Sequence, residues 1–408
     1  MRILLLHNRY QQPGGEDSVV EAEKRRLLDA GHRVVEYSRH NDEIAGYGLW
    51  QKATLAPRTV WAWDSYREIK SLLESERPDA AHVHNTFPLI SPAAYDACRD
   101  ADVPVVQTLH NYRLFCPGAA FTRKGRVCED CLGKVLPWPA ILHACYRGNR
   151  AASATAAAML GIHSALHAWA RKVDVFIALT EFARRKCIEG GLPAEKIVVK
   201  PNFVDPDPLT LNQHELGANR KSAGEPYALF LGRLAAEKGL RTLVAAWKRL
   251  DGRVPLRIVG DGPLRRELET SVNGSGSVQF EGHLTRGQVL EALKGACFLV
   301  FPSEWYEGLP LAIVEAFACG VPVIASRLGA MAEIVEDGKT GLHFTPGDSE
   351  DLAAKVEWAW THPAEMEGMG RGGRAEYEAK YTARRNYELL MDTYRGAVQA
   401  AQERNPLC

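Results

Sequence analysis

Two glutamates, Glu307 and Glu315, flank a turn that opens a helix, and their types and spacing suit the binding of a polar ligand. Pro310 suits the first helical position, where its missing N–H costs nothing, and Gly320 suits the helix end. Glu307 is therefore expected in the loop before the helix, and Glu315 one to two turns inside it. Backbone N–H groups at a helix start attract anions, and carboxylates accept hydrogen bonds from paired hydroxyls. This arrangement predicts a ligand with a diphosphate and polyhydroxylated ends, such as a nucleotide sugar.

Two cations follow an expected strand in the same half of the chain. The stretch Gly232-Arg233-Leu-Ala-Ala-Glu-Lys238-Gly239 comes directly after Tyr227–Leu231, and glycine at a strand end lets a ligand approach the backbone. Arg233 and Lys238 are expected to reach a diphosphate and to offset its charge as bonds break. The alternative is that both are solvated surface cations.

The stretch Phe301-Pro-Ser-Glu-Trp-Tyr-Glu307-Gly308-Leu309-Pro, continuing through Glu315 and Gly320 to Ser326, resembles the retaining glycosyltransferases of family four. Their signature is two glutamates separated by seven residues, followed by a small-residue helix end and a short strand. The resemblance implies that Glu315 holds the ribose hydroxyls and that Glu307, with the amides of Gly308 and Leu309, holds the donor sugar. It also implies that Arg233 and Lys238 hold the pyrophosphate in place of a divalent ion.

Three further loops are expected to border the donor. Gly14 and Gly15 form a turn before a helix expected at Ser18–Ala30, where glycines allow close approach to a phosphate. A plain turn is the alternative. The resemblance implies that the loops carrying Gly260, and His283 with Leu284, lie beside the nucleotide.

Polar residues follow two expected strands of the first half. His110 and Asn111 come directly after Val105–Leu109, and His84 and Asn85 end the preceding strand. Similar enzymes use a histidine at the first position to orient the donor sugar, so His110 is a candidate catalytic residue. His84, Asn85 and Asn111 are candidates for contact with the acceptor. A structural role is the alternative for a lone histidine.

Four of the nine cysteines, Cys116, Cys128, Cys131 and Cys145, gather in one segment. One Cys-x-x-Cys pair with two flanking cysteines can supply four thiolates to a tetrahedral zinc, and His143 could replace one of them. A long loop in a compact domain usually needs a reason to be ordered, and a structural zinc would provide one. The alternatives are buried thiols, or a redox pair at Cys128 and Cys131.

The composition is that of an ordinary soluble globular chain, with 408 residues, 46% hydrophobic and 25% charged. Lys plus Arg and Asp plus Glu number 50 each, so the balance gives no support for nucleic-acid binding. No apolar run approaches the ~20 residues of a membrane span. We expect a cytoplasmic protein, with contact at the inner membrane surface left open.

Short apolar runs alternate with longer amphipathic ones, which predicts an α/β fold with parallel sheets. The expected domains are residues 1–203, with a Cys-rich insertion at about 116–148, and 227–381, joined by a linker at 204–226. The resemblance implies the GT-B fold, with two Rossmann-like doubly wound domains facing across a cleft, and a last helix at 382–408 that packs back on the first domain. The expected strands are Ile3–Leu6, Arg33–Tyr37, Ala80–His84, Val105–Leu109, Val175–Ala178, Tyr227–Leu231, Leu256–Val259, Val278–Phe280, Leu299–Phe301 and Val321–Ala325.

These features together predict a retaining glycosyltransferase that moves a sugar from a nucleotide-diphosphate donor to a hydroxyl of a glycan, a glycolipid or a small molecule. Catalysis would need no cofactor. Two alternatives stay open. One is a sugar-nucleotide epimerase or hydrolase of the same fold, and the other is a non-catalytic nucleotide-sugar-binding scaffold.

Overall fold

The computed structural model describes residues 1–11, 14–210, 225–272 and 276–404, and the chain divides into two compact units. The linker expected at 204–226 lies partly outside the described residues, from 211 to 224. Unit 1 consists of Met1–Phe121, Cys128–Pro201 and Asn386–Cys408, and unit 2 of Thr122–Val127 and Asn202–Arg385.

Unit 1 contains a six-stranded parallel sheet with the order β2-β1-β3-β4-β7-β8. Most residues of β1, β3 and β4 are buried, as expected for parallel strands covered on both faces. The strands are β1 (Arg2–Arg9), β2 (Arg33–His40), β3 (Ala80–Asn85), β4 (Val105–Leu109), β7 (Val175–Ala178) and β8 (Ile197–Val199).

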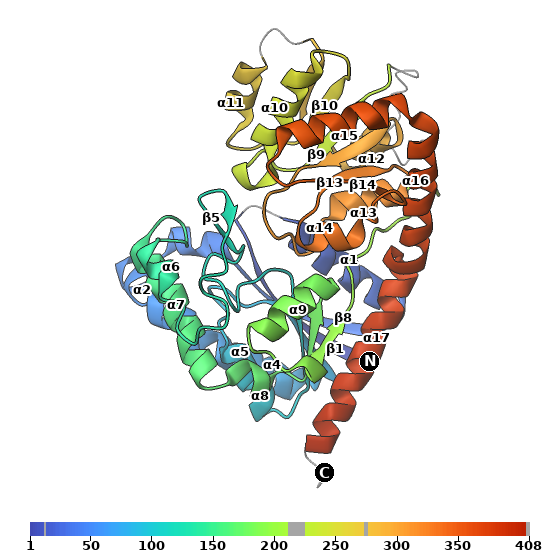
Figure 1. Ribbon diagram of the computed structural model, residues 1–408. Helices are drawn as coiled ribbons and strands as arrows, with labels where there is room; N and C mark the ends of the chain where they lie inside the picture. Colours follow the sequence, from blue (N-terminus) through green and yellow to red (C-terminus); the bar gives the residue numbers. More distant parts are fainter. Residues whose placement is uncertain (12–13, 211–224, 273–275, 405–408) are drawn as a thin grey trace. The chain divides into compact units, whose positions relative to one another are not determined.

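The helices of unit 1 connect these strands, except for α17, which comes last in the chain (Figure 1). They are α1 (Gly15–Asp29), α2 (Leu49–Ala53), α3 (Leu55–Val60), α4 (Trp63–Glu76), α5 (Ala93–Asp100), α6 (Pro139–Leu142), α7 (Arg150–Ala165), α8 (Ala168–Lys172), α9 (Glu181–Glu189) and most of α17 (Ala383–Arg404). Short 3-10 turns lie at Asn41–Gly46 and Ala194–Lys196.

Unit 2 contains a second six-stranded parallel sheet, with the order β11-β10-β9-β12-β13-β14. Its strands are β9 (Ala228–Leu231), β10 (Leu256–Val259), β11 (Val278–Gly282), β12 (Phe298–Phe301), β13 (Val323–Ser326) and β14 (Gly341–Phe344). Its helices are α10 (Leu240–Leu250), α11 (Arg265–Ser271), α12 (Arg286–Lys294), α13 (Leu311–Ala318), α14 (Gly329–Ile334), α15 (Ser349–Thr361) and α16 (Pro363–Glu376), with short turns at Ala236–Lys238 and Tyr377–Tyr381. The hairpin of β5 (Thr122–Arg123) and β6 (Arg126–Val127) also belongs to unit 2.

Helix α17 completes the core of unit 1 although it is encoded last. Leu390, Met391 and Tyr394 pack in one buried cluster with residues of β1, β3, β4 and β7. The Tyr394 hydroxyl lies 2.8 Å from Nδ1 of His82, and Asn386 donates to the carbonyl of Pro201 at 2.7 Å. The helix is therefore an integral part of the first unit.

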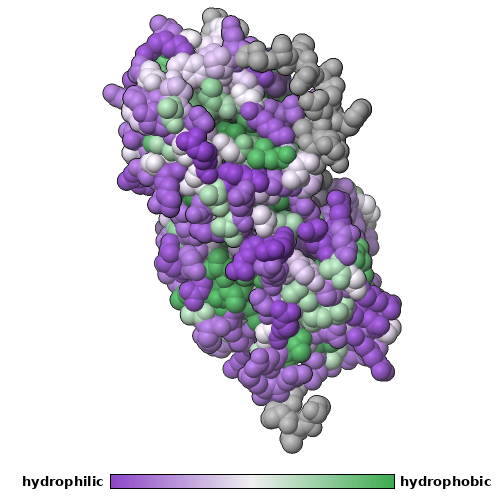
Figure 2. Space-filling view, turned by 90° about the vertical axis from the view of Figure 1, so that its right-hand side faces the viewer, coloured by the Kyte–Doolittle hydropathy of each residue, from purple (hydrophilic) through white to green (hydrophobic). Residues whose placement is uncertain are grey.

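The surface seen in Figure 2 is mainly hydrophilic, with apolar side chains gathered in smaller areas between the polar ones. Among the described helices, none combines the length and the hydropathy needed to cross a bilayer.

Candidate functional site

The strand order of unit 2 brings the two predicted donor-binding stretches together. In an open parallel sheet, ligands bind at the carboxyl ends of the strands where the strand order reverses. In unit 2 that point lies between β9 and β12, which are neighbours in the sheet. Lys238 follows β9 and Glu307 follows β12, so both side chains reach the expected crevice.

Lys238 and Glu307 are in direct contact. Nζ of Lys238 donates to Oε1 of Glu307 at 2.7 Å, and the Ser303 hydroxyl donates to the same oxygen at 2.7 Å. The ammonium also lies 5.7 Å from the ring centre of Phe301 and 5.3 Å from that of Trp305. Because Glu307 is only 8% exposed, the pair is a partly desolvated cation and anion fixed beyond the carboxyl ends of the two central strands. Sequence reasoning missed Ser303, which stands four residues before Glu307.

Close backbone contacts hold these loops in place. A Cβ on Gly239 would lie 1.8 Å from the carbonyl oxygen of Pro302, and Gly239 has a φ of 68°. A Cβ on Gly260 would lie 2.0 Å from the carbonyl oxygen of Gly232. Glycine is therefore required where the loops after β9, β10 and β12 meet.

Glu315 lies on α13 and faces the start of α12. Its carboxylate accepts from Nη1 of Arg286 at 3.0 Å, and its side chain is 14% exposed. Burial raises the pKa of Glu315 above its ordinary value, and the Arg286 charge opposes that shift. Pro310 is the N-cap of α13 and Leu311 its first residue, so the helix begins one residue later than the sequence indicated.

The other predicted donor-binding residues of unit 2 differ in their exposure to solvent. The side chain of Arg233 is 58% exposed and pairs with Glu237. His283 is exposed, and Leu284, Gly308 and Leu309 are half-buried or buried. The amide of Gly260 donates to the carbonyl of Gly282 at 2.7 Å, which joins the loops after β10 and β11.

In unit 1, His110 and His84 form a hydrogen-bonded pair. Nε2 of His110 lies 3.0 Å from Nδ1 of His84, with the rings stacked at 5.3 Å. Burial, followed by the charges of His7 and Lys200, lowers the pKa of His110 to about 3. His110 is therefore a neutral group at physiological pH that can exchange hydrogen bonds without adding charge. His84, His110, Asn85 and Asn111 help to line a small cavity of about 40 Å³.

The remaining predicted residues of unit 1 surround the ends of β1 and β3. The amide of Asn111 donates to the Tyr10 hydroxyl at 3.4 Å and lies 3.5 Å from a Glu16 oxygen. The Asn85 side chain forms hydrogen bonds with backbone groups, since it donates to the carbonyl of Asn8 and accepts from the amide of Phe87. Gly14 caps α1, and a Cβ there would meet no described atom within 4 Å. The fold itself thus leaves open space beside Gly14.

Sequence reasoning missed a set of buried polar groups beneath this region. Lys200 and Glu23, each 1% exposed, form an ion pair. His7 lies 2.9 Å from Asp17. The sequence did carry one signal of these buried polar groups, the polar residues at the end of the otherwise apolar strand β1. Glu23 gave no such signal, because it lies in a charged helical stretch that looks solvent-exposed.

Ligand atoms of Glu23, His82 and His84 lie within 4.8 Å of one another, the spacing that a metal ion needs. Both ring nitrogens of His82 already have partners, because Nδ1 contacts the Tyr394 hydroxyl and Nε2 the Thr108 hydroxyl, each at 2.8 Å. Lys200 pairs with Oε1 of Glu23. Among the described residues, Oε2 of Glu23 and Nε2 of His84 have no hydrogen-bond partner and lie 3.8 Å apart. These residues therefore fit a buried hydrogen-bond network better than a metal site.

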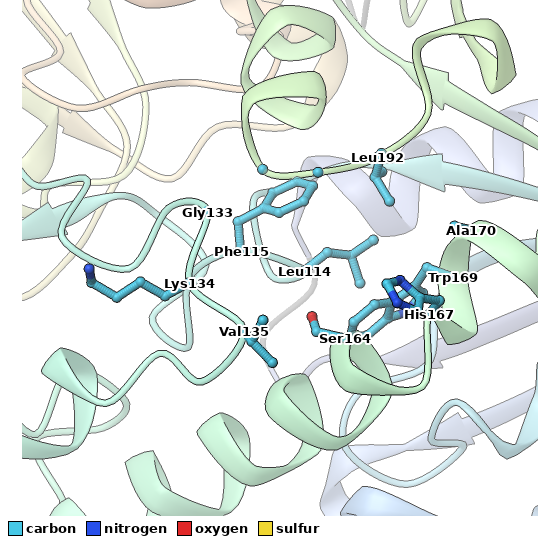
Figure 3. Close-up of a pocket in the computed structure, with 12 residues that line it drawn as sticks. Leu114, Phe115, Gly133, Lys134, Val135, Ser164, His167, Trp169, Ala170 and Leu192 are labelled. Carbon is cyan, nitrogen blue, oxygen red and sulfur yellow. The ribbon is translucent and has the colours of Figure 1, made fainter.

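The four predicted zinc ligands all belong to unit 1. Cys116 and Cys131 are buried, and Cys128 and Cys145 are half-buried. The segment that carries them lies beside a cavity of about 190 Å³, lined from this segment by Gly133 to Val135 and from α8 by Trp169. Lys134 extends away from the other labelled side chains (Figure 3).

Comparison with known families accounts for both halves of the chain. Residues 13–208 match the model described as Glycosyltransferase Family 4, and residues 213–376 match the model described as Glycosyl transferases group 1. The sulfoquinovosyl transferase SQD2 of Arabidopsis thaliana is 34% identical over 165 residues, which cover 39% of this chain and 32% of that protein. The D-rhamnosyltransferase WbpZ of Pseudomonas aeruginosa is 32% identical over 168 residues, which cover 40% and 44%. The chain thus spans less than half the length of these two relatives.

Longer matches are more distant in sequence. The glycogen synthase of Mycobacterium tuberculosis is 26% identical over 345 residues, which cover 82% of this chain and 73% of that enzyme. Among solved structures, HepE of Anabaena in complex with UDP matches with a TM-score of 0.66 at 18% identity and covers 97% of this chain and 100% of that one. Sucrose-phosphate synthase of Thermosynechococcus elongatus matches with a TM-score of 0.68 at 19% identity and covers 98% and 99%.

The structural matches confirm the GT-B class of two Rossmann-like units, and the family models confirm the resemblance inferred from the glutamate pair. The chain belongs to the glycosyltransferases of family four, and its C-terminal half to the group 1 glycosyl transferases.

Proposed function

We propose that the chain moves a sugar from a nucleoside-diphosphate donor to an acceptor hydroxyl, with retention at the anomeric carbon, in polysaccharide or glycolipid assembly. The observation that carries this proposal is the contact of Lys238 and Ser303 with one oxygen of Glu307 at the switch point of unit 2. A paired cation and anion there suit a diphosphate on one side and sugar hydroxyls on the other. Transfer itself would need no metal.

In this reaction the bond between the anomeric carbon and the phosphate oxygen breaks, and the leaving diphosphate keeps the electron pair. Lys238 and Arg233 would stabilise the charge that develops on the diphosphate. The acceptor oxygen bonds to the anomeric carbon on the same face, and its proton passes to the departing phosphate. Glu315 would accept from the ribose hydroxyls, Glu307 from the sugar, and the amides of Gly308 and Leu309 would donate to it.

In unit 1, the neutral imidazole of His110 is suited to orient a sugar hydroxyl, because His84 fixes its ring through Nε2. The cavity lined by His84, Asn85 and Asn111 is the proposed contact for acceptor groups. A Cβ on Gly14 would meet open space at the start of α1, and Gly15 beside it is exposed, so a phosphate could approach backbone amides there.

Nucleotide binding gives the first test. UDP, GDP, ADP, dTDP and CDP are compared by thermal shift, with and without attached sugars. At a hundredfold excess over Kd a ligand stabilises the folded state by about 2.7 kcal/mol, which corresponds to roughly 5–10 °C in a domain of this size. We expect a shift selective for one base and its loss in Glu315→Ala, because the ribose then loses its carboxylate.

Glu367→Ala is the matched control, because Glu367 is 75% exposed and pairs with Arg371 one helical turn away. The control should keep the full shift. No shift with any nucleotide would contradict the proposal and favour a non-catalytic scaffold. Donor turnover at full rate without any acceptor would instead favour the epimerase or hydrolase alternative.

The composition of one surface of unit 1 supports the proposal that the acceptor is held at a membrane. Helix α7 packs against both α3 and α6, of which α6 is labelled beside it in Figure 1. Large apolar side chains are exposed on and beside these helices. They are Leu49, Trp50, Val135, Leu136, Trp138, Leu142, Ile162 and Leu166. The stretches 47–63 and 131–173 contain Lys and Arg but no Asp or Glu. Exposed apolar groups with only positive charge match an anionic lipid surface.

Vesicle binding tests this contact. Trp50 is 80% exposed and Trp138 51% exposed, so serine at both positions should leave the fold intact. Burying one such side chain contributes about 1.5–3 kcal/mol, so Trp50→Ser with Trp138→Ser should weaken co-sedimentation with anionic vesicles by at least about tenfold. Trp358→Ser, on an exposed face of unit 2, is the control. Equal binding by the double variant, or no binding to anionic vesicles by the parent protein, would refute the contact.

A further inference from the structure

The cysteine-bearing segment of unit 1 has little regular structure of its own. Between β4 and α7, the described residues of unit 1 form turns and the four-residue helix α6. Four cysteines nevertheless lie in this stretch, and Cys116 and Cys131 are buried. Buried thiols in a segment without a sheet or a long helix need a separate explanation.

The chain path returns the four cysteines to one place. A Cβ on Gly118 would lie 3.7 Å from Sγ of Cys116 and 3.8 Å from Cβ of Cys145, so the first and last cysteines meet across Gly118. The amide of Cys128 donates to the carbonyl of Phe121 at 2.7 Å, which brings the chain back after the intervening hairpin. The rings of Tyr112 and Phe121 lie 4.8 Å apart, and the carbonyl of Tyr112 accepts from the amide of Cys116 at 2.9 Å. These contacts bring Cys128 toward Cys116, and Cys131 follows three residues later.

Several residues beside these cysteines adopt a backbone conformation that costs free energy. Ala119 and Phe121 follow Cys116 with φ of 66° and 46°, and Ala144 and Arg147 flank Cys145 with φ of 49° and 55°. Residues with a Cβ rarely occupy this left-handed region, and they do so where surrounding interactions impose it. The strain is concentrated where the cysteines converge.

Apolar packing anchors the segment at its edges. The Phe115 ring lies against Gly190, where a Cβ would come within 2.3 Å of it, and Leu136 lies against Gly161 in the same way at 2.9 Å. Between these anchors the wall of the segment borders the cavity of about 190 Å³ (Figure 3). A segment that borders a cavity gains less from burial, so another interaction should contribute to its order.

We infer that Cys116, Cys128, Cys131 and Cys145 bind one structural zinc ion. A Cys-x-x-Cys pair with two flanking cysteines matches the tetrahedral four-thiolate site, with Zn–S distances of about 2.3 Å. Among the described residues, ligand atoms of Glu23, His82 and His84 lie within 4.8 Å of one another, and the four cysteine sulfur atoms are less closely grouped. Zinc binding would therefore bring the four sulfur atoms closer together.

Charge balance supports this ligand set. Each sulfur releases a proton on binding, so four protons leave and the site carries a net charge of −2. A cation lies close by, since Arg113 donates to the carbonyl of Pro117 beside Cys116. His143 is exposed, whereas Cys145 is half-buried, which favours the cysteine as the fourth ligand.

Metal analysis of the full chain, purified without chelators, tests the inference. We expect about one zinc per chain by inductively coupled plasma mass spectrometry. Cys131→Ser should lose it, and His143→Ala should keep it. Cys297→Ser is the matched control, because Cys297 is exposed and belongs to unit 2, and this variant should also keep one zinc.

A cobalt titration keeps the test decisive if Cys131→Ser fails to fold. The parent protein, stripped of metal, should bind one Co²⁺ and develop the thiolate charge-transfer absorption of a four-sulfur tetrahedral site, and zinc should displace the cobalt. Absence of zinc together with no cobalt binding would overturn the inference. A mass two hydrogens lower, mapped to Cys128 and Cys131, would do the same and assign a redox pair.

This site and the proposed transferase activity can fail independently. The nucleotide-dependent thermal shift arises in unit 2, whereas all four cysteines belong to unit 1. A protein that holds zinc but binds no nucleotide would refute only the transferase proposal.

Discussion

Replacing Glu307 by glutamine is expected to lower kcat by about two to three orders of magnitude, the effect seen when one preorganised electrostatic group is lost from a transition state. The carboxylate holds Lys238 and Ser303 through one oxygen. Glutamine keeps the shape and an acceptor oxygen, but it removes the charge that positions the ammonium against the leaving diphosphate. The rate of nucleoside diphosphate release, with donor and acceptor both saturating, measures the change.

The Glu307 variant should stay folded, because the amide can still accept from both partners. Glu367→Gln, at an exposed position of α16, is the control and should keep the parental rate. A kcat within threefold of the parent, at an unchanged thermal midpoint, would remove Glu307 from the proposed mechanism.

Replacing Lys200 by methionine should destabilise unit 1 by about 3–5 kcal/mol, the usual result of leaving one member of a buried ion pair without its partner. Lys200 and Glu23 are each 1% exposed and lie in direct contact. Methionine fills similar space but leaves the Glu23 charge uncompensated. At about 2–4 °C per kcal/mol for a domain of this size, the thermal midpoint should fall by roughly 6–20 °C.

The double variant Glu23→Gln with Lys200→Met separates charge from packing. It removes both charges at similar volume, so it should recover most of the lost stability. If the double variant were no more stable than Lys200→Met alone, the loss would come from the packing of the lysine stem instead.

The predictable parts of the fold were those with local signals. Apolar runs that end at a glycine or a histidine located the strands before Gly232, Gly260 and His110 to within one residue. The strands β8 and β14 were not predicted, because each is only three or four residues long. In addition, β14 contains Gly341 and His343, so it does not read as an apolar run although all four of its residues are buried. The stretch Asp337–Gly341 reads as a turn, and β14 begins only at its last residue.

The donor site was predictable because its residues stand directly after strands, and the strand order then brings them together. The ion pair of Lys200 and Glu23 could not be predicted, because the two residues are 177 positions apart in the chain. Nothing local marks either one as buried. The hydroxyl of Ser303 was missed for a different reason, since a serine near a glutamate is too common a pattern to be informative.

The position of α17 has a consequence for synthesis on the ribosome. Tyr394 fills the core of unit 1, yet almost all of unit 2 is translated between Pro201 and that residue. At about 5–20 residues per second, this delay lasts roughly 10–40 s. The nascent first half must therefore wait with part of its apolar surface uncovered while the second half is made, so the order of folding differs from the order of translation.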